Sequence, residues 1–141
     1  MAFAKKMLSC GVYYKTESRM ATPFRHFNTF FGDPVRAILT MHLNKAIKED
    51  NLVELAVETG AFLETGLNEL AKKYPRFIQN VRGKGTFLAF DSETVADREA
   101  LINGLRKHGI IQGICGTQTI RLRPCLYFEK KHAAIYIERL D

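Results

Sequence analysis

Two long stretches in the first half of the chain repeat apolar residues at intervals of three and four, the spacing of one buried helix face. The first follows Asp33-Pro34, a helix start signal, and should run to about Glu49. The second begins at Asn51, which forms a capping-box pattern with Glu54, and continues until Pro75 stops it. The pattern therefore predicts two successive helices.

After Pro75 the pattern changes to short β-prone runs separated by glycine-containing turns. Arg82-Gly83-Lys84-Gly85 predicts a hairpin turn, and Gly109 predicts the left-handed residue that ends a helix. The predicted elements are strands at 77–81 and 86–90, a helix at 96–108, strands at 110–114 and 119–122, and a helix from about 129. This order indicates an α+β fold with mostly antiparallel pairing.

The first 32 residues differ from the rest of the chain. Residues 1–14 predict a short buried strand and turn around Cys10-Gly11, and residues 15–32 predict a long loop whose aromatic part packs under other residues. An initial strand followed by such a loop is an unusual start for an independent domain. We therefore expect that sequence is missing before Met1.

Composition and charge exclude some functions. The chain has 141 residues, 46% of them hydrophobic, and a formal charge of +6 that favours anionic ligands. Its basic residues are scattered and no apolar stretch reaches the ~20 residues of a membrane span, so we expect neither nucleic acid nor membrane as a partner. Neither the three cysteines (Cys10, Cys115, Cys125) nor the four histidines (His26, His42, His108, His132) have metal-ligand spacing, and we expect reduced, mostly buried thiols.

Two basic pairs are candidates for chemistry. Lys5 and Lys6 lie between apolar residues, where desolvation would make an amine available as a nucleophile, although both lysines can equally be solvated at a strand end. Arg121 and Arg123 alternate along a predicted strand, where a guanidinium could bind a carboxylate or simply be a surface charge. Gly83 and Gly85 lack the helix that a dinucleotide-binding loop requires, so they indicate hairpin glycines.

Four ordered motifs carry a resemblance to a known family. They are Phe3-Ala4-Lys5-Lys6-Met7-Leu8-Ser9-Cys10-Gly11, Phe27-Asn28-Thr29-Phe30-Phe31-Gly32-Asp33-Pro34, the hairpin from Tyr74 to Phe87, and Thr119-Ile120-Arg121-Leu122-Arg123-Pro124. With these motifs nearly the whole chain resembles the C-terminal third of class III pyridoxal phosphate-dependent aminotransferases. The resemblance is to the branch that acts on 4-aminobutyrate.

The resemblance implies a fold and a division of the chain. The fold would be the α+β C-terminal small domain of a fold-type I pyridoxal phosphate-dependent transferase, preceded by a strand, an interface loop and a long helix of the large domain. Residues 1–48 would be a remnant of the large cofactor-binding domain. Residues 49–141 would be the small domain, truncated within its last helix.

The resemblance also implies site residues. The cofactor lysine would be Lys6, four residues before a Gly-Gly pair that here is Cys10-Gly11. Thr29 would bind the phosphate of pyridoxal 5′-phosphate across a homodimer interface, and Arg121 would bind the substrate α-carboxylate. We assign no metal ligands, because the iron–sulfur cysteines of the family would lie upstream.

The implied reaction transfers the amino group of 4-aminobutyrate to 2-oxoglutarate, giving succinate semialdehyde and glutamate in the mitochondrial matrix. No targeting segment is recognisable in these residues. The alternatives are a class III transaminase for another ω-amine, or a non-catalytic remnant that keeps only the small-domain fold. We expect the 141 residues alone to be inactive, because the groups that contact the cofactor ring would be contributed by preceding sequence.

Overall fold

The computed structural model describes residues 1–25, 27 and 29–141; His26 and Asn28, both part of the sequence motifs above, lie outside the described residues. The chain divides into two compact units, residues 1–51 and residues 52–141. Each unit is described by itself. That the first is the remnant of a larger cofactor-binding domain stays a prediction.

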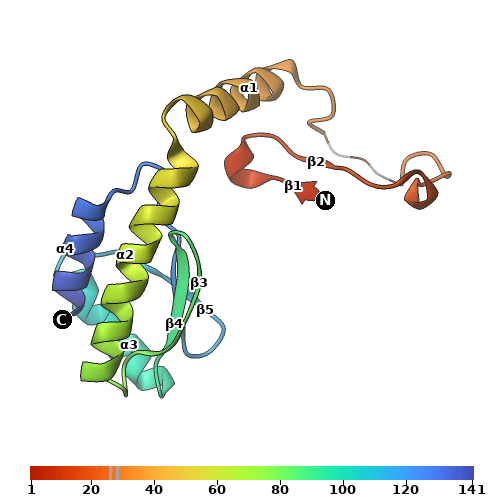
Figure 1. Cartoon of the computed structure of the whole chain (residues 1–141). Coiled ribbons are helices and arrows are strands. Elements are labelled where there is room, and N and C mark those ends of the chain that lie inside the picture. Colours follow the sequence, from red (N-terminus) through yellow and green to blue (C-terminus); the bar gives the residue numbers. More distant parts are fainter. Residues whose placement is uncertain (26, 28) are drawn as a thin grey trace. The chain divides into compact units, whose positions relative to one another are not determined.

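The first unit combines a small hairpin with one long helix (Figure 1). Strands β1 (Ala2–Phe3) and β2 (Gly11–Val12) pair antiparallel, and the 3₁₀ turn η1 (Lys5–Met7) lies between them. A second 3₁₀ turn, η2 (Thr16–Ser18), precedes helix α1 (Pro34–Glu49). The predicted strand and turn and the predicted helix are confirmed.

Helix α1 begins where Asp33 and Pro34 predict. Asp33 Oδ1 accepts a hydrogen bond of 2.9 Å from the Val35 amide, and Pro34 occupies the first helical turn. At the other end Asn51 has φ of 51°, the left-handed conformation of a residue that follows a helix. The predicted capping box at Asn51 is therefore wrong, because a helix N-cap residue requires an extended backbone.

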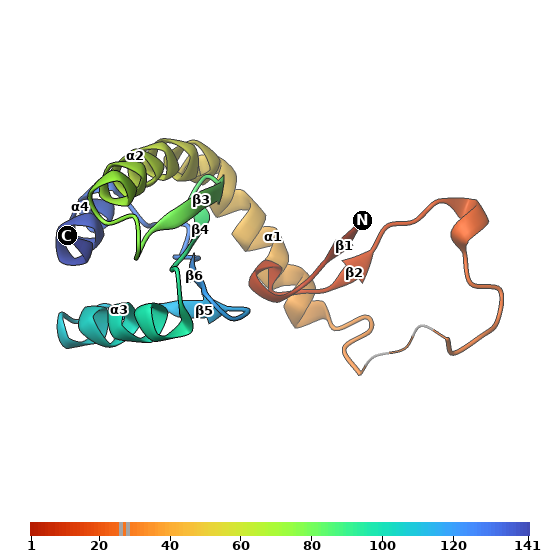
Figure 2. The same cartoon turned by 90° about the horizontal axis from the view of Figure 1, so that it is seen from below.

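The second unit is a four-stranded antiparallel sheet with helices on one side (Figures 1 and 2). The sheet order is β3-β4-β6-β5. The elements are α2 (Leu52–Lys73), β3 (Gln79–Lys84), β4 (Phe87–Asp91), α3 (Val95–Lys107), β5 (Gly113–Cys115), β6 (Thr119–Leu122) and α4 (Lys130–Leu140). Apart from shifts of a few residues at their ends, these are the predicted elements.

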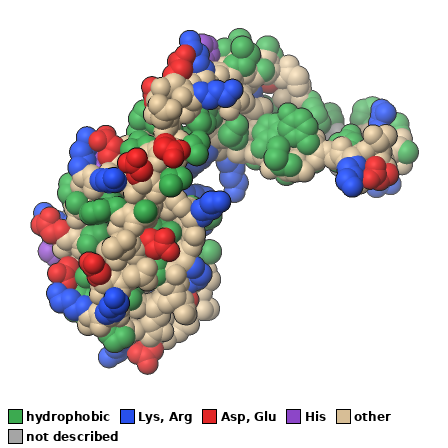
Figure 3. Space-filling view, in the orientation of Figure 1, with side chains coloured by type: hydrophobic (Ala, Val, Ile, Leu, Met, Phe, Trp, Pro, Cys, Tyr) green, Lys and Arg blue, Asp and Glu red, His purple; other side chains and the backbone are tan. Residues whose placement is uncertain are grey.

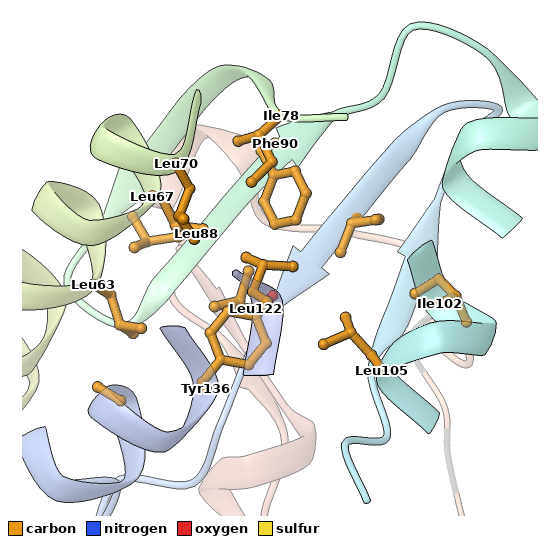
Figure 4. Close-up of a cluster of buried hydrophobic side chains, with 13 residues drawn as sticks. Leu63, Leu67, Leu70, Ile78, Leu88, Phe90, Ile102, Leu105, Leu122 and Tyr136 are labelled. Atoms are coloured by element: carbon orange, nitrogen blue, oxygen red, sulfur yellow. The ribbon is translucent and has the colours of Figure 1, made fainter. Parts of the chain in front are cut away.

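The core of this unit lies between the sheet and the helices (Figure 4). Leu88 and Phe90 of β4 and Ile120 of β6 are at most 1% exposed and pack with Leu63 and Leu67 of α2. Because side chains alternate across a strand, the residues between them, such as Ala89 and Arg121, face the opposite side of the sheet. The described helices leave that side open, and it holds the site described below.

The β3–β4 turn differs from the prediction. Lys84 pairs with Phe87, so the turn is only Gly85-Thr86, and Gly85 alone has a positive φ, 55°. Gly83 stays within β3, where an added Cβ would lie 2.1 Å from the Phe87 carbonyl oxygen. The predicted four-residue turn is wrong because Gly83 is required by close backbone packing and not by turning of the chain.

Helix α3 ends at the predicted glycine. Gly109 has φ of 79°, and its amide donates to the Arg106 carbonyl while the Ile110 amide donates to the Leu105 carbonyl. These bonds hold Ile110 at the helix end, so β5 begins only at Gly113 and not at the predicted Ile110.

Apolar side chains of the first unit are more exposed than predicted (Figure 3). The loop expected to pack under other residues exposes its aromatic side chains, among them Phe24, Phe27, Phe30 and Phe31. The cysteines are also exposed: Cys115 lies on the edge strand β5, and Cys10 and Cys125 lie in loops. None of the three forms a disulfide, but the expectation of buried thiols is wrong.

Candidate functional site

Lys6 lies in an exposed turn whose shape depends on the hairpin around it. It belongs to η1, which the neighbouring Lys5 enters with φ of 58°. Across the hairpin the Phe3 ring lies against Gly11, where an added Cβ would be 2.5 Å from the ring carbon Cζ. Gly11 must therefore stay glycine, whereas Cys10 has no positive φ and accommodates a side chain.

The lysine-bearing turn is also attached to helix α1. The Thr40 hydroxyl donates a hydrogen bond of 2.9 Å to the carbonyl of Met7, the residue after Lys6. The same hydroxyl lies 2.9 Å from the Arg36 carbonyl within the helix. The backbone that carries Lys6 is therefore fixed to the middle of α1, while its side chain is exposed.

Thr29 lies in a turn just before α1, and its side chain is exposed. The segment is held by Arg36, whose guanidinium carbon is 3.8 Å from the centre of the Phe30 ring and whose Nε is 3.4 Å from Asp33 Oδ2. An exposed hydroxyl at this place, near the positive end of a helix, is chemically suited to an anion such as a phosphate. No described contact assigns Thr29 to a ligand.

Arg121 lies in the second unit, on the open face of the sheet. It pairs with Ala89 on one side and Gly113 on the other, so both neighbouring side chains are small. A Cβ added at Gly113 would lie 3.4 Å from Arg121 Nη2, which shows that the guanidinium extends over that glycine. Arg121 is half-buried, and its guanidinium makes no printed hydrogen bond or ion pair within the described part of the chain.

Arg121 contributes to the walls of two pockets in this unit. One, of about 560 Å³, lies over the open sheet face and includes Arg82, Ala89 and Cys115. The other, of about 470 Å³, includes Gln112 and Tyr136. The buried Tyr136 hydroxyl has no hydrogen-bond partner among the described residues; burial raises the pKa of this phenol, and the adjacent Gln112 amide opposes that shift.

Arg123 does not share the face of Arg121 as predicted. Strand β6 ends at Leu122, so the alternation of side chains stops before Arg123, which lies exposed in the following loop. Arg121 is therefore the residue of this pair that the sheet positions.

A second polar cluster on the open face was not found from the sequence. Asp91 accepts hydrogen bonds from Arg82, Thr119 and Asn80. Burial alone would raise the pKa of Asp91, but these hydrogen bonds and the charge of Arg82 outweigh it and hold that pKa below its ordinary value. The alternation Phe87, Ala89, Asp91 was the available signal, because it places Asp91 on the face of Arg121.

The residues present fit pyridoxal phosphate in their chemistry: a primary amine for an aldehyde, a hydroxyl for a phosphate and a guanidinium for a carboxylate. Lys6 and Thr29 belong to the first unit and Arg121 to the second. Across residues 1–25, 27 and 29–141, no group of three or more His, Cys, Asp or Glu side chains could hold a metal ion. No helix in these ranges is both long and apolar enough to cross a membrane.

The fold and these groups define a segment suited to small anionic substrates, and comparison with known proteins gives its family. The sequence matches the family described as Aminotransferase class-III over residues 1–141. The chain therefore belongs to the class III aminotransferases.

Similar proteins agree with this family. The 4-aminobutyrate aminotransferase of Dictyostelium discoideum is 40% identical over all 141 residues, and the mitochondrial 4-aminobutyrate aminotransferase of Homo sapiens is 41% identical over 97% of the chain. The chain spans 28% and 27% of the length of these two relatives.

The comparison with solved structures tests the fold. A lysine aminotransferase from M. tuberculosis is 30% identical, with a TM-score of 0.87 over 99% of this chain and 33% of that one. The predicted fold class, an α+β segment of a fold-type I transferase, is confirmed.

Proposed function

We propose that this chain is part of a pyridoxal 5′-phosphate-dependent aminotransferase that moves the amino group of 4-aminobutyrate to 2-oxoglutarate. The products are succinate semialdehyde and glutamate. The main support is the identity of about 40% along the whole chain to relatives named for 4-aminobutyrate. The second support is the unpaired guanidinium of Arg121 on an open sheet face, which suits the carboxylates of these substrates.

In this proposal the cofactor, when bound, supplies the electron sink that makes the carbon–hydrogen bond of the substrate acidic. Lys6 binds the cofactor aldehyde carbon through its ε-amine, and the same amine, once released, carries the proton between substrate and cofactor carbons. Its attachment to α1 through Met7 and Thr40 restricts where that amine can move.

Arg121 binds the α-carboxylate of glutamate and 2-oxoglutarate through two parallel hydrogen bonds. Ala89 and Gly113 leave space on both sides of the guanidinium for the incoming carboxylate. Thr29 donates its hydroxyl to the phosphate of the cofactor bound by a second copy, which makes a homodimer the active form. We further propose the mitochondrial matrix as the location, as in the mitochondrial relative from Homo sapiens.

The second candidate is a class III transaminase for a different ω-amine. The similarity to a lysine aminotransferase favours considering it, but the identity is 30% there and 40% for the relatives named for 4-aminobutyrate. The third candidate is a polypeptide without catalysis that keeps only the small-domain fold.

The test uses the full-length protein that carries this segment, supplied with pyridoxal phosphate and 2-oxoglutarate. We expect turnover of 4-aminobutyrate to exceed that of lysine and ornithine, and we expect Lys6→Ala to abolish it. Lys5→Ala is the matched control and should keep most of the activity. After borohydride reduction, peptide mapping should find the cofactor on Lys6.

Three outcomes would overturn parts of this proposal. Faster turnover of another amine would favour the second candidate, and cofactor on Lys5 would move the catalytic position. No turnover by the full-length protein would favour the third candidate. The isolated 141 residues serve as a negative control, and we expect no turnover from them.

A further inference from the structure

Two arginines flank the same alanine on the open face of the sheet. Arg82 of β3 pairs with Ala89 of β4, and Ala89 pairs with Arg121 of β6, which in turn pairs with Gly113 of β5. The four residues form one row across the sheet. The two guanidinium groups therefore begin from equivalent positions on either side of Ala89.

Asp91 lies two residues after Ala89 on the same face, diagonal to both arginines. It pairs directly with Thr119 of β6, while Arg82 and Arg121 are both in the adjacent row. Diagonal neighbours of this kind are within reach of long side chains. Geometry alone therefore allows Asp91 to bind either arginine.

The structure shows which arginine Asp91 binds. Arg82 Nη1 lies 3.0 Å from Asp91 Oδ2 and Arg82 Nη2 lies 2.9 Å from Oδ1, a bidentate pair. The Thr119 hydroxyl donates to Oδ1 at 2.6 Å and the Asn80 amide to Oδ2 at 3.2 Å. Two carboxylate oxygens offer about four lone-pair positions, so these four donors occupy Asp91 completely.

Arg82 is itself fixed on the side away from Arg121. Its Nη1 also donates to the Asn80 carbonyl at 2.8 Å, within its own strand. Its Nη2 lies 3.3 Å from the Thr119 hydroxyl. The pair of Arg82 and Asp91 is therefore a fixed group in the sheet, and the Arg121 guanidinium remains outside it.

We propose that Arg82 is a positioning residue of the carboxylate site, because by occupying Asp91 it keeps that carboxylate from pairing with Arg121. The proposal rests on the proposed function only in taking Arg121 as the group that binds the substrate carboxylate. Removing Arg82 leaves Asp91 with two fewer donors, and Arg121 is the cation one strand away. The resulting internal ion pair would compete with every carboxylate substrate.

The first test measures kinetics in the full-length protein. Arg82→Gln should raise the KM for 2-oxoglutarate and for glutamate by about tenfold, equivalent to ~1.4 kcal/mol, while kcat changes little. The double variant Arg82→Gln with Asp91→Asn should restore most of the lost affinity, since the competing charge is gone. A double variant no better than Arg82→Gln would overturn the proposal.

The second test needs no substrate and uses the 141-residue chain with ¹³C-labelled aspartate. In Arg82→Gln the Asp91 carboxyl should still titrate below the ordinary range, because Arg121 replaces Arg82. Adding Arg121→Gln to that variant should raise the Asp91 titration. If Arg121→Gln has no such effect, Arg121 does not take over and the proposal is wrong.

The two tests separate this proposal from the proposed function. If NMR shows the new pair but KM does not change, the pairing is correct and Arg121 does not bind the substrate carboxylate. Arg82→Lys covers the case in which Arg82→Gln fails to fold, because a lysine keeps the charge next to Asp91. That variant should retain a KM close to that of the wild type, and a tenfold increase would contradict the proposal.

Discussion

Helix α2 approaches the β3–β4 turn so closely that one methyl group should change the stability of the second unit. A Cβ added at Gly60 would lie 2.2 Å from the backbone carbonyl carbon of Gly85 and 2.3 Å from its oxygen. Carbon atoms in contact are roughly 3.5–4.0 Å apart, so helix and turn must separate by roughly 1.3 Å or more. Both sides of this contact are backbone, which cannot rotate away as a side chain would.

The magnitude follows from two opposing effects. Overpacking costs about 1–3 kcal/mol, and a backbone contact belongs at the upper end of that range. Alanine gains about 1 kcal/mol over glycine in a helix interior. We therefore expect Gly60→Ala to lower the free energy of unfolding by about 2 kcal/mol, which is about 8–16 °C in Tm for a unit of this size.

The chain contains two matched controls. At Gly104 in α3 an added Cβ meets no atom within 4 Å, so Gly104→Ala should stabilise by about 0.5–1 kcal/mol. At Gly66 in α2 it would meet only the end of the Ile137 side chain, at 2.9 Å, which can shift, so Gly66→Ala should be close to neutral. Urea and thermal unfolding of the 141-residue chain, followed by circular dichroism, measures all three. A Gly60→Ala protein as stable as Gly104→Ala would refute the reasoning.

Two further predictions concern the polar groups of this unit. The Ser92 hydroxyl is buried and donates to the Phe77 carbonyl at 2.9 Å, so Ser92→Ala should cost about 1 kcal/mol in urea unfolding, whereas the exposed Thr65→Ala should change stability little; equal effects would contradict a role for burial. The pKa of Asp97 is lowered by its hydrogen bonds with Arg76 and Thr94, so its stabilisation is present above the unfolded pKa of ~3.9 and is lost as pH falls through the folded value. Unfolding midpoints should therefore fall more steeply below about pH 4 in the wild type than in Asp97→Asn, and parallel curves would show that Asp97 does not contribute.

Local signals in the sequence were sufficient where one residue determines the backbone. Asp33-Pro34 predicts the start of α1 and Gly109 the end of α3, because capping and positive φ are properties of those residues themselves. Gly83 was placed in a turn because glycine permits turning and close approach equally, and only the position of Phe87 across the hairpin separates the two.

The candidate site divides in the same way. Spacing to Cys10-Gly11 and similarity to a family led to Lys6, Thr29 and Arg121 as predictions. The ion pair of Arg82 with Asp91 depends on the register of three strands, and no local pattern in the sequence contains that register. The exposed cysteines and aromatic residues of the first unit were also missed, because apolar character does not show which residues lie nearby to cover them.

The hydrogen bond from Thr40 to Met7 has a consequence for the disorder of the lysine-bearing turn. A hairpin with only two paired residues in each strand is barely stable in water, so by itself η1 would sample many conformations. Each backbone residue confined to one conformation costs about 1–2 kcal/mol of entropy, and folding of α1 provides part of that confinement. Any reaction at Lys6 then starts from a turn whose entropy has already been lost, and motions of α1 displace the amine with it.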